Sequence, residues 1–122
     1  MARALVVEDD ADLLELLGKH LHRLGCEVTL AKNGRAGLDA LAECPPDVAI
    51  VDILLPDMDG HDVIEALRKA QGDRPCRIVT TSVLDPQDIG ADSDAVLPKP
   101  FSRNDFDRVV RPLLEELRSA AP

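Results

Sequence analysis

The sequence lacks any apolar run approaching the ~20 residues that cross a membrane, so we expect no membrane anchor. The opening residues 1–3, before a short apolar stretch, are too few for a secretory signal, and we expect a cytoplasmic protein. Basic residues are also few, because 14 Lys and Arg face 23 Asp and Glu, for a net charge of −9. Since nucleic acids and anionic membranes both require a basic face, we expect neither as a direct partner.

Thiols and imidazoles are too sparse for a soft metal site. The chain has three cysteines, an odd number without a close pair, at Cys26, Cys44 and Cys76. This spacing fits neither a disulfide framework nor a zinc site, and we interpret all three as core or loop residues. His20 and His22 cannot share a helical face, and His61 stands alone. Histidine or thiolate metal ligands are therefore not expected.

Short apolar runs recur along the chain and have the form of strands buried on both faces. They lie at residues 4–7, 48–51, 78–81 and 95–97, with a further strand indicated by Val28 and Leu30. Segments with apolar residues at helical spacing alternate with them, at residues 13–24, 36–42, 63–67 and 106–117. The polar stretch 85–94 contains Pro86 and Gly90, and it predicts at most a shortened or irregular fourth helix.

Five strand-helix units with short connections predict one α/β domain over residues 1–122. Such a chain folds as a doubly wound, five-stranded parallel sheet with helices on both faces. Ser102 and Asp105 resemble a capping box for the last helix, and Pro112 is expected to interrupt or kink it. In folds of this kind, ligands bind beyond the carboxyl ends of the strands.

The side chains that follow the predicted strands are chemically related. They are Glu8 and Asp9, then Asp52, then Thr81 and Ser82, and finally Lys99. Converging carboxylates favour a bound cation, and oxygen ligands without histidine or thiolate favour Mg²⁺. A lysine opposite them offers a positive charge to an incoming anion. These groups are the ones that phosphoryl transfer to a carboxylate requires.

Four strings carry a resemblance to a known family: LVVEDD, VDILLPDMDG, TTS and PKPF, each following its own predicted strand. Together they resemble the CheY-like receiver domain of bacterial response regulators, over roughly positions 3 to 118. Each string alone is weak evidence, and their order along the chain makes the resemblance specific. It implies a flavodoxin-like sheet with strand order 2-1-3-4-5.

The resemblance also implies a metal site and a phosphorylation site. Asp52 matches the phospho-accepting aspartate and a metal ligand. Asp9 matches a direct Mg²⁺ ligand, for which Mn²⁺ can substitute, and Glu8 a ligand acting through water. The backbone carbonyl of Leu54 completes the implied ligands, and Lys99 matches the family's lysine, preceding a cis bond to Pro100.

One further role, that of the switch hydroxyl, is assigned less sharply. Thr81 matches it best, because Ser82 then supplies the small residue expected next. A shift of one residue would give the role to Thr80 or Ser82 instead. We expect Asp57 and Asp59 to be solvated loop acids without a chemical role.

The implied function is two-component or phosphorelay signalling. A sensor histidine kinase or a histidine phosphotransfer protein would donate the phosphoryl group. We expect a single-domain regulator, monomeric or dimerising on phosphorylation, that acts on an unidentified output protein and catalyses only its own phosphorylation and dephosphorylation. The alternative is a fragment of a transcription factor or hybrid kinase. A further alternative is an interaction module that is never phosphorylated. Another is a hydrolase with an aspartate nucleophile. Leu54 speaks against the hydrolase, because such an enzyme normally has its second acid at that position.

Three departures from the family pattern bear on output and turnover. Val96 occupies the position of the usual switch aromatic, and the segment from Thr81 to Lys99 is short for the family. Leu54 and Val83 are apolar where polar groups would orient an attacking water, so we expect slow self-dephosphorylation.

Overall fold

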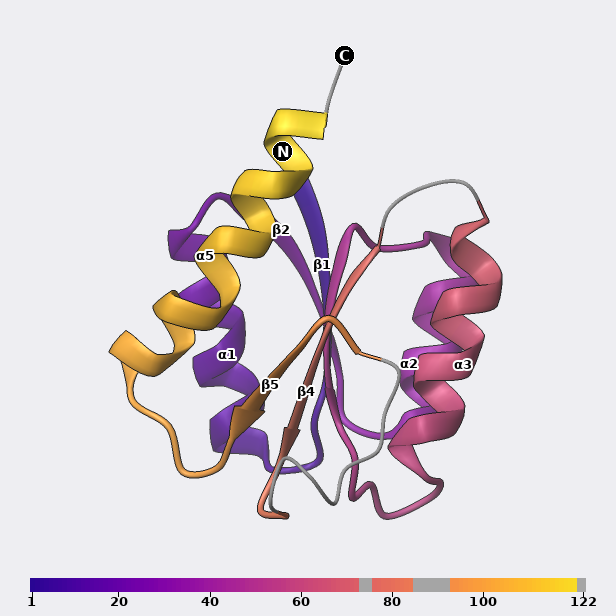
Figure 1. The fold of residues 1–122 in the computed structure, drawn as a ribbon. Helices are drawn as coiled ribbons and strands as arrows, with labels where there is room; N and C mark the ends of the chain where they lie inside the picture. The colour runs from indigo at the N-terminus through magenta and orange to yellow at the C-terminus, as the bar shows by residue number, and fades with distance from the viewer. Residues whose placement is uncertain (73–75, 85–92, 121–122) are drawn as a thin grey trace.

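A five-stranded parallel sheet forms the centre of the fold (Figure 1). The computed structural model describes residues 1–72, 76–84 and 93–120. Its strands are β1 (Ala2–Val7), β2 (Cys26–Ala31), β3 (Val48–Asp52), β4 (Arg77–Ser82) and β5 (Ala95–Pro98). The spatial order is β2-β1-β3-β4-β5, and every neighbouring pair is parallel. The predicted fold class and strand order are both confirmed.

Helices cover both faces of the sheet, as Figure 1 shows. The described part of the chain contains α1 (Ala11–Arg23), α2 (Gly34–Glu43), α3 (Gly60–Gln71) and α5 (Arg103–Ala120). Helices α1 and α5 pack on one face, and α2 and α3 on the other. The predicted short fourth helix falls mostly on residues 85–92, which lie outside the described residues. None of the described helices is both long and apolar enough to cross a membrane.

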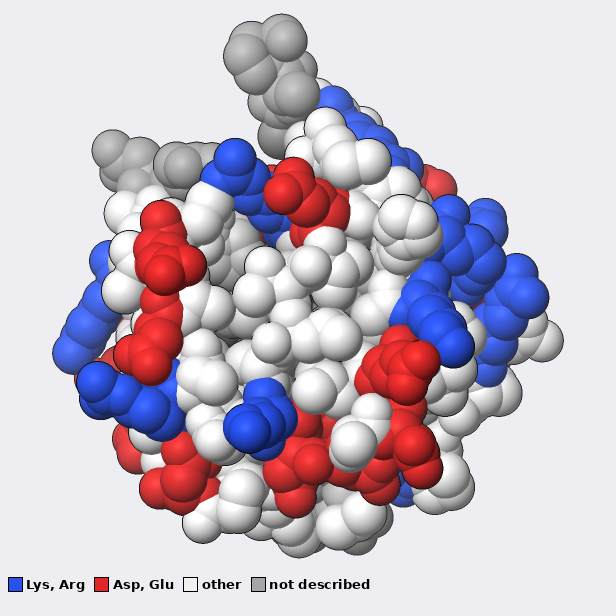
Figure 2. All heavy atoms as spheres, turned by 180° about the vertical axis from the view of Figure 1, so that it is seen from behind, with Lys and Arg blue, Asp and Glu red and all other residues white. Residues whose placement is uncertain are grey.

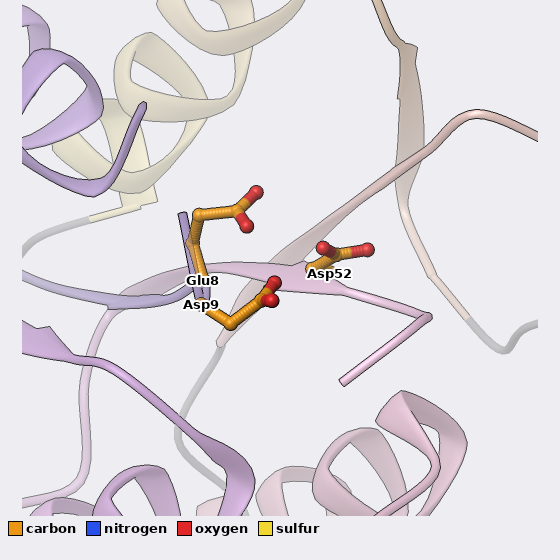
Figure 3. Close-up of side chains that lie close together, drawn as sticks. All are labelled: Glu8, Asp9 and Asp52. Atoms are coloured by element: carbon orange, nitrogen blue, oxygen red, sulfur yellow. The ribbon is translucent and has the colours of Figure 1, made fainter. Parts of the chain in front are cut away.

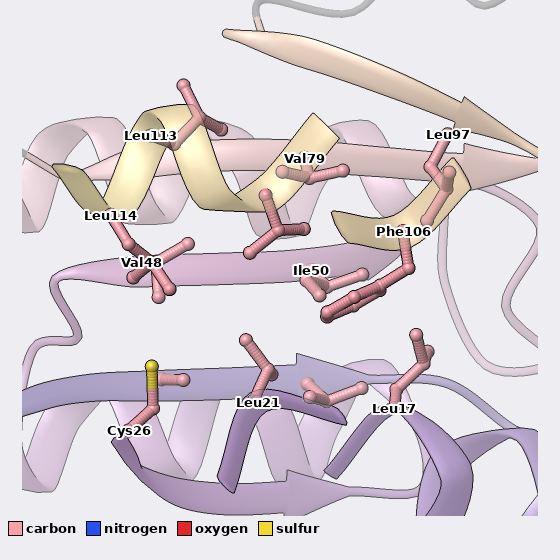
Figure 4. Packing of buried hydrophobic residues seen from close by; sticks show 13 residues of the cluster. Leu17, Leu21, Cys26, Val48, Ile50, Val79, Leu97, Phe106, Leu113 and Leu114 are labelled. Carbon is pink, nitrogen blue, oxygen red and sulfur yellow. The ribbon is translucent and has the colours of Figure 1, made fainter. Parts of the chain in front are cut away.

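The strands form where the sequence is apolar on both sides. Residues 4–7 of β1 and all five residues of β3 are buried, as expected of central strands covered by helices on both faces. Alternate side chains enter opposite cores, so Val6 lies on the α1/α5 side and Val7 on the α2/α3 side. Phe106 of α5 is fully buried at the centre of the first core, beside Ile50 and Leu17 (Figure 4).

The last helix begins as predicted and ends differently. The Ser102 Oγ accepts a hydrogen bond from the Asp105 amide at 3.1 Å, and the Asp105 carboxylate accepts one from the Ser102 amide at 2.9 Å. This reciprocal pair confirms the capping box. The expected interruption at Pro112 is wrong, because α5 is one helix of 18 residues through that position. Pro112 is exposed, so water can satisfy the helical carbonyl that it leaves without a donor.

The register of the sheet determines which residues meet at its carboxyl edge. Asp52 is the Cα partner of Thr81, and Thr81 is the partner of Leu97. Val7 pairs with Val51, so the residue after each lies at the same level. The ends of β1, β3, β4 and β5 therefore open onto one edge, where the predicted site residues lie.

Candidate functional site

Three carboxylates converge at the carboxyl edge of the sheet (Figure 3). One oxygen each from Glu8, Asp9 and Asp52 lies within 4.8 Å of the others. Glu8 is only 1% exposed and Asp52 4%, whereas Asp9 is exposed to solvent. Two of the three acids are thus held inside the protein, where like charges repel strongly unless a cation compensates them.

Lys99 supplies one compensating charge. Its Nζ donates to Glu8 Oε1 at 2.6 Å and to Asp52 Oδ2 at 3.0 Å, and its side chain is 17% exposed. The Lys99-Pro100 peptide bond is cis, as the resemblance implied. Lys99 directly follows the end of β5, so the fold brings together an amine and a carboxylate that are 47 residues apart in sequence.

The environment shifts the pKa values of two of these groups. Burial raises the pKa of Glu8 above its usual range, and hydrogen bonds from Lys99 and the Asp10 amide oppose the shift only in part. The negative charge of Asp52 adds to this rise. Burial alone would lower the pKa of Lys99, but its hydrogen bonds to Glu8 and Asp52 outweigh that effect and raise it. Lys99 is therefore firmly cationic, and Glu8 protonates more readily than an ordinary glutamate because its pKa is raised.

The three candidate hydroxyls at the end of β4 are in different situations. Thr80 Oγ1 lies 3.3 Å from Ser93 Oγ, and Ser82 Oγ accepts a hydrogen bond from the Leu84 amide at 3.1 Å. Thr81 is fully buried, and its Oγ1 has no hydrogen-bond partner among the described residues. A buried hydroxyl without a partner is costly, so the Thr81 hydroxyl is the one available for a further acceptor at this edge.

The loop after β3 is tied to Asp52. The Leu54 amide donates to Asp52 Oδ1 at 3.0 Å, and the Gly60 amide donates to the Ile53 carbonyl at 2.9 Å. Gly60 lies directly against the backbone, because a Cβ there would lie 2.6 Å from Ile53 Cα and would also overlap the Asp52 carbonyl oxygen. Only glycine allows this approach, which fixes the loop beneath the acidic cluster.

Asp57 has a structural role that its sequence context does not reveal. It is exposed, as expected, but its two carboxylate oxygens accept the amides of Gly34 and Arg35 at 2.8 and 2.9 Å. It thereby caps the start of α2 from the loop after β3, across 23 residues of sequence. Asp59 likewise caps α3 by accepting the His61 amide at 2.9 Å. Asp59 follows the local capping pattern, whereas no local pattern could have predicted the long-range contact of Asp57.

The donor set suits a hard divalent cation. Both oxygens of Glu8 already accept hydrogen bonds, from Lys99 and from the Asp10 amide at 3.1 Å. The Asp9 carboxylate makes no hydrogen bond or ion pair with the described residues, and one Asp52 oxygen faces the same space. Oxygen donors of this kind fit Mg²⁺ better than zinc or copper. The roles of Asp9 as a direct ligand and of Glu8 as a ligand through water remain predictions.

Val96 occupies the position expected for a switch aromatic. It is half-buried and packs against the core beneath α2 and α3. Its Cα partner in the sheet is Thr80, so it lies one residue before the level of Thr81.

The structure thus combines a doubly wound parallel sheet with acids, a lysine and a buried hydroxyl at its carboxyl edge. A family model described as the response regulator receiver domain matches residues 4–111, and the chain belongs to this family. It is accordingly a domain of two-component signalling.

Individual relatives support this assignment. The response regulator MprA of Mycolicibacterium vanbaalenii is 36% identical over 115 residues, covering 92% of this chain and 50% of that protein. The transcriptional regulatory protein PrrA of Mycobacterium tuberculosis is 37% identical over 122 residues, covering 98% of this chain and 52% of that protein. TrrA of Thermotoga maritima, solved in complex with Mg²⁺ and BeF, has a TM-score of 0.76, 29% identity, and coverage of 93% of this chain and 99% of that one.

The chain spans about half the length of the curated relatives it matches. PrrA is named as a transcriptional regulator, so the relatives do not support the expectation that nucleic acid is no partner.

Proposed function

We propose that this domain is a phosphorylation switch in which Asp52 receives a phosphoryl group from a phosphohistidine. The observation that carries the proposal is the double contact of Lys99 with the buried carboxylates Glu8 and Asp52, at 2.6 and 3.0 Å. A partly buried amine placed against a reactive carboxylate has positive charge ready for the phosphoryl oxygens before the donor arrives.

The covalent step is an exchange at phosphorus. A carboxylate oxygen of Asp52 forms a bond to phosphorus as the bond from phosphorus to the donor imidazole nitrogen breaks. The imidazole leaves with the bonding electron pair and takes a proton from solvent. The Leu54 amide and Lys99 hold the Asp52 carboxylate by one oxygen each, which orients it before attack.

Thr81 is the proposed switch residue. Its buried hydroxyl lacks a partner among the described residues, so a phosphoryl oxygen on Asp52 would give it the acceptor that it lacks. Thr80 and Ser82 are less suited, because their hydroxyls already contact Ser93 and the Leu84 amide.

We propose that Asp9 and Asp52 hold Mg²⁺, with Glu8 acting through water and the Leu54 carbonyl as a further ligand. When bound, the ion neutralises the charge that develops on the phosphoryl oxygens. Mn²⁺ has similar ligand preferences and would substitute. Without a cation the three carboxylates face only one lysine, which leaves an excess of negative charge that repels a phosphoryl donor.

Incubation with acetyl phosphate and Mg²⁺, followed by intact-mass measurement, tests the proposal. We expect one added phosphoryl group, no addition in Asp52→Asn, and none when EDTA removes the metal. Asp39→Asn is the matched control, because Asp39 is an exposed acid on α2 that pairs with Arg35 at 3.4 Å. Phosphorylation of Asp52→Asn to the same extent as Asp39→Asn would refute the role of Asp52.

Slow decay of the phosphorylated form follows from the surroundings of Asp52. Leu54 is 52% exposed and Val83 70% exposed, and neither side chain carries a group that could orient an attacking water. We expect the domain to act as a switch rather than a hydrolase, without turnover of an aryl phosphate. Multiple turnovers of such a substrate, absent in Asp52→Asn, would favour the hydrolase.

A second candidate concerns the whole protein. The chain matches half of MprA and PrrA, which favours a receiver part within a longer transcriptional regulator over a single-domain regulator acting through protein contacts. The length of the native reading frame decides between them. A reading frame that ends at Pro122 would support the single-domain form, and a following DNA-binding segment would support the regulator.

A further inference from the structure

Lysine and arginine side chains gather on the side of the molecule formed by α1 and α5 (Figure 2). A cavity of about 360 Å³ lies there between the end of α1 and the last turns of α5. Its lining includes three arginines, one acid and two leucines: Arg23, Arg111, Arg118, Glu115, Leu24 and Leu114. This volume lies within the range of small-molecule sites. The three arginines in the lining indicate that the ligand is an anion.

Two of the three guanidinium groups are held in place. Arg118 Nη2 donates to the Leu24 carbonyl at 2.7 Å, and Arg23 Nη2 donates to Asp107 at 2.6 Å. Gly25 makes room for Arg118, because a Cβ at this residue would lie 3.3 Å from Arg118 Nη2. Each of these contacts uses one terminal nitrogen, and the remaining donors of the planar fork stay available.

Arg111 is different, because its guanidinium makes no hydrogen bond or ion pair with the described residues. It is exposed and lies one helical turn before Glu115 on α5. Its charge and that of Arg103 act on Asp107 and help to lower the pKa of that acid, after the hydrogen bond from Arg23. The region thus contains more positive charge than its own acids neutralise.

The charge balance is opposite to that of the rest of the protein. The four charged residues that line the cavity carry a formal charge of +2: Arg23, Arg111, Arg118 and Glu115. The whole chain carries −9, so all other residues together carry −11. A local excess of positive charge against that background attracts anions specifically to this place.

We propose that the cavity between α1 and α5 binds a compact polyphosphate anion, recognised by Arg23, Arg111 and Arg118. Phosphate oxygens match the donor fork of arginine, and a polyphosphate offers enough oxygens for three forks at once. Leu24 and Leu114 give the cavity an apolar wall, and the two anchored arginines reduce the entropy lost on binding. This site is separate from Asp52 and does not depend on the proposed function.

Titration of the protein with pyrophosphate, with EDTA present to remove metal, tests the proposal by backbone amide NMR. We expect saturable shifts at Leu24, Gly25 and Leu114. Arg111→Gln should weaken binding about tenfold, the equivalent of one charge-assisted hydrogen bond. Since the Arg111 side chain has no partner among the described residues, its replacement leaves the remaining amide spectrum intact.

Three comparisons make the experiment decisive. Arg35→Gln removes the same charge from α2, at a side chain that forms an exposed pair with Asp39, and should change the affinity by less than about twofold. Arg111→Lys retains the charge without the fork and should bind more weakly than the wild type. Citrate, a polycarboxylate, should bind more weakly than pyrophosphate. Absence of saturable shifts, equal losses in Arg35→Gln and Arg111→Gln, or equal affinity for citrate would each overturn the assignment.

Discussion

Replacing Lys99 by methionine should destabilise the protein in a manner that depends on pH. Lys99 is the amine between Glu8 and Asp52, which are 1% and 4% exposed, so its removal leaves two buried carboxylates without that cation. Breaking a buried ion pair by removing one partner costs about 3–5 kcal/mol. Lys99→Met keeps the aliphatic stem, so the change reports mainly on charge.

Protonation of Glu8 limits that cost. The pKa of Glu8 is already raised by burial from its ordinary value of 4.5, and losing Lys99 raises it further. Keeping an acid protonated in the folded state costs about 1.4 kcal/mol for each pH unit above its unfolded pKa, so protonation of Glu8 destabilises the variant by at most about 3 kcal/mol at pH 7. The folded variant binds this proton more tightly than the unfolded chain does. The destabilisation that Glu8 causes is therefore absent below pH 4.5 and grows as the pH rises towards the folded pKa.

Urea unfolding at pH 7 and at pH 4.5 measures this effect. Circular dichroism is the appropriate probe, because the chain contains no tryptophan or tyrosine. We expect Lys99→Met to lose up to about 4 kcal/mol at pH 7, about 3 from keeping Glu8 protonated and about 1 from the lost hydrogen bonds, and only the latter about 1 kcal/mol at pH 4.5. Lys69→Met is the control, since Lys69 forms an exposed pair with Glu65 and its replacement should cost less than about 1 kcal/mol. An equal loss at both pH values would refute the reasoning.

Three further changes have distinct outcomes. Gly60→Ala should cost about 1–3 kcal/mol by overpacking, visible as a lower Tm, and should slow phosphorylation of Asp52, whose backbone the new methyl group would displace. Asp57→Asn should lower the Tm at pH 7. Backbone hydrogen bonds depress the pKa of Asp57, so this stabilisation is present above 3.8 and is lost as pH falls through the folded pKa, and wild type and variant should converge in acid. Ellman's reagent should react rapidly with the exposed Cys44, but with Cys76, whose pKa burial raises to about 11, only after unfolding.

The sequence predicted most of the fold because its signals are local. Apolar runs such as residues 4–7 and 48–51 specify buried strands, and the capping pair Ser102 and Asp105 marks the start of α5. The expected break at Pro112 failed because a proline on an exposed helix face can be tolerated when water satisfies the freed carbonyl.

The site was predictable to the level of which residues meet, and no further. The order of strand ends and the family resemblance placed Glu8, Asp52 and Lys99 at one edge, and the structure brings them together. The partner of each hydroxyl, which separates Thr81 from its neighbours, depends on side-chain geometry that no spacing rule contains. The contact of Asp57 with the start of α2 is tertiary in the same sense.

A crystal structure with Mg²⁺ and beryllofluoride would show whether Asp52 accepts a phosphoryl group among these acids, the lysine and the hydroxyl. We expect beryllium bonded to a carboxylate oxygen of Asp52, Lys99 Nζ and Thr81 Oγ1 both donating to fluorine, and the metal bound by Asp9. An Asp52 without the adduct under saturating beryllofluoride, or a Thr81 hydroxyl still without a partner beside it, would refute the proposed switch.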